Sequence, residues 1–151
     1  MLVFTASLIL TAVVAFIQTT NWILLGNIIK PNLILVTLVT LALINPSWIR
    51  RTALITTAAL ILKFTPGLAL LDFIFVGAAL VAILLADFLP WRQPVSLLVA
   101  ILVGTVIVNL DHLSLLPLIY ELILNLLLGF ILFNLLKLVY VSEIKLQKSR
   151  F

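Results

Sequence analysis

The sequence predicts an all-α integral membrane protein: a single bundle of six transmembrane helices, two of them short, with both termini in the cytoplasm. The first reason is composition, because 65% of the 151 residues are hydrophobic and only 9% are charged. A water-facing exterior on a domain of this size needs far more polar surface. The second reason is that the basic residues fall mainly in alternate gaps between apolar runs, a pattern that sets the orientation of spanning helices.

Six apolar runs, separated by most of the Pro and Gly residues, define the expected helices. In chain order they are Leu2–Gln18, Leu33–Ile44, Thr52–Leu62, Leu68–Leu89, Val95–Leu110 and Leu115–Tyr140. Their continuous apolarity has no two-residue alternation, which favours helices over a transmembrane barrel. No other stretch could bury a second core, so we expect one domain over 1–151, ending in a short basic cytoplasmic tail over 142–151.

The first run, Leu2–Gln18, is expected to be a retained span. It follows Met1 directly, with no basic residue ahead of it and no convincing small-residue cleavage site after it. A removed signal peptide normally carries both features, so that alternative is the less favoured one.

The second and third runs are the two short elements. Leu33–Ile44 and Thr52–Leu62 hold 12 and 11 residues, about 16–18 Å of helix against a bilayer core of about 30 Å. A re-entrant hairpin would leave Arg50 and Arg51 near the bilayer middle, at about 2.5–3.5 kcal/mol each. Two short or tilted spans that borrow flanking residues such as Trp48 avoid this cost. We favour the two spans, which also suit a chain that packs against partners.

The last three runs are bounded by breakers or polar residues. Pro66-Gly67 precedes the fourth run and Pro90 ends it. Asp111-His112 ends the fifth run, and this pair resembles a proton or metal site. The chain has no other His and no Cys to complete a ligand set, so the pair is interpreted as a turn or helix cap.

The distribution of Lys and Arg predicts the orientation. With six spans, both termini share one side with the second–third and fourth–fifth gaps. That side holds Arg50, Arg51, Arg92, Lys137, Lys145, Lys148 and Arg150, of which the first five are the expected topology anchors. The other side holds only Lys30 and Lys63. Because basic loops are retained in the cytoplasm during insertion, the first side is predicted to be cytoplasmic.

Small residues at four-residue spacing mark the expected packing faces, since close approach of helices in lipid depends on small side chains. They are Ser7, Thr11 and Ala15 in the first run, Ala78, Ala82 and Ala86 in the fourth, and Ala100 and Gly104 in the fifth. Most are expected to pack within the bundle. The first-run ladder is the best candidate for receiving a partner's helix, because terminal helices are often peripheral. A homo- or hetero-oligomer is compatible with these faces.

Polar residues inside the runs are the candidates for function. Glu121 and Asn125 share a helix face, with Tyr120 adjacent. Glu121 is either a functional intramembrane carboxyl group or an interfacial anchor that reaches water. Asn125 and Asn134 lie deeper and are expected to form hydrogen bonds across helices.

Two further acidic residues lie near span ends. Asp72 could pair with Lys63, and Asp87 invites the same interpretation with Arg92. Such pairs at an interface contribute little to stability.

The residue inventory argues against catalysis and against nucleic-acid binding. The sequence has no Gly-rich phosphate loop, paired carboxylate site or nucleophile elbow. It has no cysteine and one histidine, so we expect no metal, cofactor or enzymatic activity. The net charge of +4 comes from basic residues at span ends and not from a basic patch, so the expected surroundings are the lipid bilayer and membrane proteins.

Three segments resemble the rod-shape-determining MreD family. Lys30-Pro31-Asn32 followed by Leu33-Ile34-Leu35-Val36 is similar to the start of its second span, and Gln18 to the end of its first. Ala59–Leu85, broken by Thr65-Pro66-Gly67, resembles its third and fourth spans. The stretch from Tyr120-Glu121 through Asn125-Leu126-Leu127 to Phe133–Lys137 resembles its last span and basic exit. Lys63 departs from the family, which usually has an acidic residue there.

The resemblance implies a multi-pass protein of the bacterial inner membrane that acts as a scaffold without chemistry of its own. Its expected partners are a membrane-anchored MreC-like protein and other proteins of the cell-wall elongation machinery. The suspected fold relatives of the family are the substrate-binding subunits of energy-coupling-factor vitamin transporters. A small substrate-binding transporter subunit is therefore the alternative function, with a cavity lined by Glu121, Asn125, Tyr120 and Asp72.

Overall fold

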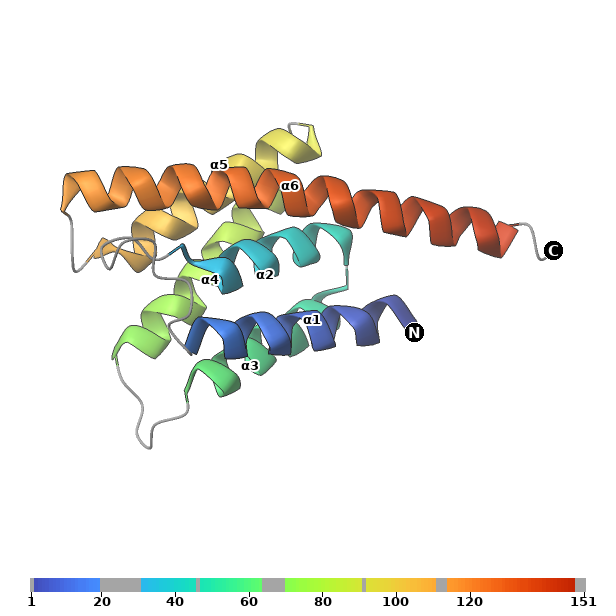
Figure 1. Ribbon diagram of the computed structural model, residues 1–151, viewed down its shortest axis with the longest axis horizontal. Helices are drawn as coiled ribbons and strands as arrows, with labels where there is room; N and C mark the ends of the chain where they lie inside the picture. The colour runs from blue at the N-terminus through green and yellow to red at the C-terminus, as the bar shows by residue number, and fades with distance from the viewer. Residues whose placement is uncertain are drawn as a thin grey trace.

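The computed structural model describes residues 2–19, 31–45, 47–63, 70–90, 92–110 and 114–148. Of these, the side chains of Leu2, Leu71 and 140–148 are outside the description. Within these residues the chain forms six α-helices and no strand, as the sequence predicts (Figure 1). The helices are α1 (Leu2–Thr19), α2 (Leu33–Ile44), α3 (Trp48–Leu62), α4 (Leu70–Phe88), α5 (Gln93–Val108) and α6 (Leu115–Lys148).

The helix α2 forms the centre of the bundle. Residues 34–42 are all buried, and α2 packs against each of the other five helices. A helix that is apolar all round is typical of a protein core or of a membrane span. The helix α2 is 12 residues long, and Figure 1 shows it between α1 and α6.

Small side chains bring the outer helices close to this centre. The helices α4 and α5 pack on each other, and Ala78 and Ala82 of α4 and Ala100 and Gly104 of α5 are all buried. A Cβ added to Gly104 would lie 3.1 Å from Cδ2 of Leu35 and 3.3 Å from Cβ of Ala82. A side chain at position 104 would therefore crowd both α2 and α4.

The small residues of α1 also face the interior. Ser7, Thr11 and Ala15 are at most 4% exposed, and α1 packs on α2 and α3. The Ser7 hydroxyl donates to the Val3 carbonyl, and the Thr11 hydroxyl donates to the Ser7 carbonyl. This ladder is therefore not the exposed face that a docking site for a partner's helix would need.

One helix in the described part of the chain is long and apolar enough to cross a bilayer. It is the stretch Leu115–Val139 of α6, 25 residues or about 37 Å of helix. Val3–Thr19, Leu33–Ile44 and Gln93–Val108 are apolar but shorter. The helix α6 continues eight residues beyond the predicted end at Tyr140, and Figure 1 shows its C-terminal part extending past the other helices.

Large apolar side chains cover much of the outside of the bundle. On α6 they include Ile119, Ile123, Leu127, Phe130, Ile131, Leu135 and Leu138; on α1, Ile9, Val13 and Phe16; and on α4, Leu70, Phe73, Val81, Leu84 and Phe88. An exposed apolar surface of this extent is unusual for a water-soluble monomer, and it marks contact with lipid or with another protein.

Candidate functional site

Two polar clusters close the two ends of α2. The amide cluster at its N-terminus comprises Gln18, Asn32, Thr105 and Asn125, with Asn109 and Glu121 beside them. The arginine cluster at its C-terminus comprises Asn45, Arg51 and Asp87. Helix ends leave backbone groups without partners, and burial of those groups is costly unless side chains satisfy them. Both clusters provide hydrogen-bond partners for the backbone groups at the ends of α2.

The first N–H groups of α2 all find acceptors in the amide cluster or next to it. Asn32 is the N-cap residue, and its Oδ1 accepts from the Leu35 N–H at 3.1 Å. The Ile34 N–H donates to Oε1 of Gln18 at 3.0 Å, and Nε2 of Gln18 donates to Asn32 Oδ1 at 3.3 Å. The Leu33 N–H donates to the Pro31 carbonyl. Gln18 thereby ties the end of α1 to the start of α2.

Asn125 extends the amide cluster across the bundle. Its Oδ1 accepts from the backbone N–H of Asn32 at 2.9 Å, although the two residues are 93 positions apart in the chain. Its Nδ2 donates to Oγ1 of Thr105 at 3.0 Å. Asn125 is completely buried, so this amide joins α2, α5 and α6 as predicted for a hydrogen bond across helices.

Glu121 lies one turn before Asn125 on α6, at the edge of the amide cluster. Its carboxyl group lies near the side chains of Asn109 and Asn125. Glu121 is partly exposed. The Glu121 side chain therefore borders the amide cluster on its outer side.

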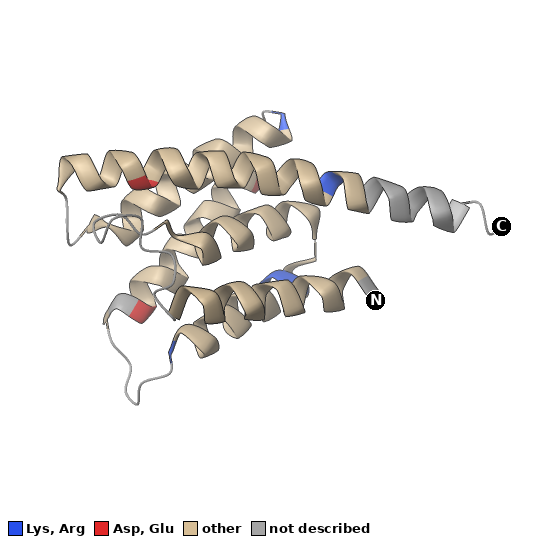
Figure 2. Ribbon diagram, in the orientation of Figure 1, with Lys and Arg blue, Asp and Glu red and all other residues tan. Residues whose placement is uncertain are grey.

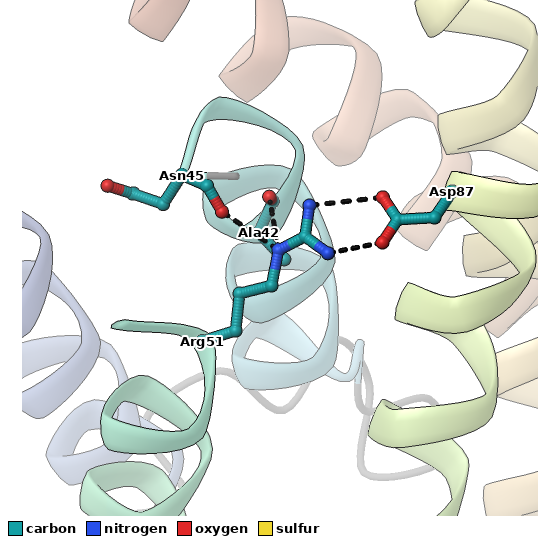
Figure 3. Close-up of polar contacts among 4 residues, drawn as sticks. All are labelled: Ala42, Asn45, Arg51 and Asp87. Atoms are coloured by element: carbon teal, nitrogen blue, oxygen red, sulfur yellow. Dashed lines mark hydrogen bonds and ion pairs between the residues drawn. The ribbon is translucent and has the colours of Figure 1, made fainter. Parts of the chain in front are cut away.

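The arginine cluster satisfies the other end of α2 (Figure 3). Nε of Arg51 donates to the carbonyls of Ala42 at 3.0 Å and of Asn45 at 2.8 Å. Nη1 and Nη2 of Arg51 bind the two carboxylate oxygens of Asp87, the second at 3.0 Å. Nδ2 of Asn45 donates to the Leu41 carbonyl. One guanidinium group thus holds the carbonyl end of α2 against α4.

The ion pair is buried on the arginine side. Arg51 is 4% exposed, whereas the Asp87 side chain is 34% exposed. The Trp48 ring covers the guanidinium group at 5.1 Å from the ring centroid. Asp87 therefore pairs with Arg51 and not with Arg92, which is exposed at the N-cap of α5. Arg51 is therefore a buried residue that connects α3 to α2 and α4 at this end of the bundle.

The other predicted polar residues do not join either cluster. Tyr120 is 53% exposed on the surface of α6, and Asp72 lies in the first turn of α4. Asn134 is exposed, and its Nδ2 donates to the Phe130 carbonyl of its own helix at 2.7 Å. The expected hydrogen bond to another helix therefore forms at Asn125 but not at Asn134.

The remaining basic and acidic residues that the structure describes belong to neither cluster. Arg50 is exposed, with its guanidinium 5.6 Å from the Phe4 ring centroid, and Nζ of Lys137 is 6.0 Å from that of Phe133. Lys30, Asp111, His112 and the side chain of Lys145 lie outside the described residues.

The polar side chains of both clusters form hydrogen bonds with one another or with backbone groups. Among the side chains that the structure describes, no group of three or more His, Asp or Glu residues is placed to hold a metal ion. The cluster amides, the Arg51 guanidinium and the Asp87 carboxylate bond to one another or to helix ends. Sequence reasoning identified Asn125 but missed Gln18, Asn32 and Thr105 as its partners, because only the fold brings these residues together.

Comparison with protein-family models, with curated proteins and with solved structures finds no match to this chain.

Proposed function

We propose that the chain is a multi-pass protein of the bacterial inner membrane and acts as a non-enzymatic scaffold of the MreD type in the cell-wall elongation machinery. The observation that carries the proposal is that the bundle has polar clusters in its interior and a largely apolar outer surface. Inside the bundle, polar side chains form hydrogen bonds to backbone groups at each end of the central helix α2. On the outside of the bundle, large apolar side chains are exposed. This arrangement suits a bundle whose outside meets lipid and partner helices.

The positions of the charges support the proposed orientation. Among the residues that the structure describes, Figure 2 shows most Lys and Arg positions toward the end of the bundle where both termini lie, with one basic position at the far end of α3. Arg50 begins α3, Arg92 precedes α5, and Lys137 lies late in α6. Basic residues concentrated at one end mark that end as cytoplasmic.

The placement of the polar residues favours a scaffold over a substrate-binding subunit. The latter would need Glu121, Asn125, Tyr120 and Asp72 around one outward cavity. Asn125 is instead fully buried and bonded, and Tyr120 is exposed. Asp72 belongs to α4, whereas α6 packs mainly on α2 and α5. These four residues do not form one lining.

Cysteine labelling tests the topology directly, because the native sequence contains no cysteine. Arg92→Cys and Ser149→Cys should react with a membrane-impermeant maleimide only after the cells are permeabilised. Lys63→Cys should react in intact cells. Labelling of positions 92 and 149 from opposite sides of the membrane would contradict the six-span arrangement.

Native co-purification with mass spectrometry tests the scaffold role. Recovery of an MreC-like protein and peptidoglycan synthases would support the proposal, whereas recovery of a transporter ATPase pair would overturn it. A thermal-shift screen with vitamins checks the same point, because a bound ligand stabilises the folded state.

A further inference from the structure

The outward face of α6 combines an apolar seam with one exposed amide. Leu127, Ile131 and Leu138 are 46–71% exposed, and Asn134 is exposed between them. Their spacing of four, three and four residues places all four on one helix face with the repeat of a coiled-coil seam. The opposite face, with Asn125, Gly129 and Phe133, is buried in the bundle.

The exposed amide is unusual at this position. Asn134 lies within Leu115–Val139, the stretch of α6 that is apolar and long enough to span a bilayer. Polar side chains inside spans normally face protein, because lipid offers them no hydrogen bonds. One N–H of Asn134 donates to the Phe130 carbonyl. The other N–H and the carbonyl oxygen can therefore serve a partner amide.

We infer that α6 pairs with α6 of a second copy of this chain through the seam Leu127, Ile131, Asn134 and Leu138. The inference rests on the proposed membrane insertion. Two copies inserted with the same orientation are related by a two-fold axis along the membrane normal, so the helices are parallel and Asn134 meets Asn134. An amide is both donor and acceptor, so two copies form a reciprocal pair of hydrogen bonds.

The surroundings of the seam fit this occupant. The seam side chains are exposed on the face of α6 that points away from the other helices, so a parallel helix can approach them. Lys137 directs its ammonium group toward the Phe133 ring, which belongs to the buried face, and so leaves the seam free of its charge. A single polar residue in such a seam is known to fix register and oligomeric state.

Disulfide cross-linking in membrane vesicles tests the pairing. Single-cysteine variants Leu127→Cys, Ile131→Cys and Leu138→Cys should form dimers on mild oxidation. The matched controls are Phe130→Cys and Leu135→Cys, which are 51% and 56% exposed on the same helix but roughly 70° from the seam centre. Equal cross-linking at seam and control positions would overturn the inference.

The role of the amide is tested in the same assay. Adding Asn134→Leu to the Ile131→Cys variant should lower the cross-linked fraction roughly three- to tenfold, the range expected for loss of interhelical hydrogen bonds. Adding Asn134→Gln should retain most of it, because the amide remains. An unchanged fraction with Asn134→Leu would overturn the assigned role of the amide.

The assay separates this inference from the proposed function. Absence of the protein from the membrane fraction would refute the membrane scaffold itself. Membrane-inserted protein that gives no seam disulfide would refute only the homodimer, and would show that lipid or a different protein covers α6.

Discussion

Arg51 and Asp87, 36 residues apart in the chain, form a two-point ion pair that fastens the C-terminal end of the central helix to α4. The same guanidinium group donates to the Ala42 and Asn45 carbonyls. A single side chain therefore links α2, α3 and α4. Its neighbour Arg50 is exposed and makes none of these bonds, and this contrast gives the first prediction.

Arg51→Ala is expected to lower the free energy of unfolding by about 3–5 kcal/mol, because it strips donors from two carbonyls and leaves Asp87 unpaired. Arg50→Ala, the adjacent control, should change it by less than about 1 kcal/mol. Chemical unfolding in detergent micelles, followed by circular dichroism, measures both. Equal losses at the two positions would show that the ion pair does not hold α2 in place.

The amide cluster predicts a difference between two asparagines on the same helix. Asn125→Ala removes bonds to Asn32 and Thr105 in a fully buried position, so unfolding should become easier by about 1–3 kcal/mol. Asn134→Ala should cost less than about 0.5 kcal/mol in dilute detergent, because Asn134 is exposed there. Thermal unfolding of the two variants compares them, and a larger loss for Asn134→Ala would contradict the cluster.

Two glycines provide a matched test of helix packing. Gly104→Leu should lower stability by about 1–3 kcal/mol, because a side chain there meets Leu35 and Ala82. Gly77→Leu should be neutral or stabilising, since a Cβ on Gly77 has no neighbour within 4 Å and leucine favours the helix. The measurement is the denaturant midpoint of each variant. A neutral Gly104→Leu would mean that α5 does not approach α2 so closely.

Thr11→Leu separates a packing role from a docking role for α1. Thr11 is fully buried, so the larger side chain should destabilise the bundle by about 1–3 kcal/mol. Val13→Ala, on the exposed face of the same helix, should have little effect on stability. If the Thr11 ladder instead bound a partner, Thr11→Leu would reduce co-purification while leaving the melting temperature unchanged.

Hydropathy and breakers located the helices well, because continuous apolar runs and Pro positions constrain the chain locally. Leu33–Ile44 is both the predicted run and the observed α2. The apolar run Thr52–Leu62 begins four residues after α3 does, because the helix includes the flanking Trp48, as expected of a short span, together with two polar arginines. The predicted run likewise ends at Tyr140, before the end of α6, because Lys, Ser and Glu are tolerated within a helix.

The polar contacts could be predicted only in part. Asn125 stood out as an amide in an apolar run, but its partners depend on which ends of α2 and α5 meet it. Proximity in sequence suggests Arg92 as a partner for Asp87, whereas the fold brings Arg51 to it from α3. Helix faces follow from spacing, but contacts between helices depend on how the whole bundle packs.

The enclosure of α2 has a consequence for biogenesis. The second helix to leave the ribosome receives its last partners from the final segments of the chain, since Asp87 and Asn125 are synthesised long after Ile44. A nascent chain that stops before residue 125 lacks the amide that bonds the Asn32 N–H. Assembly of this bundle therefore ends with α6, and until that helix is synthesised the innermost helix α2 lacks part of its enclosure.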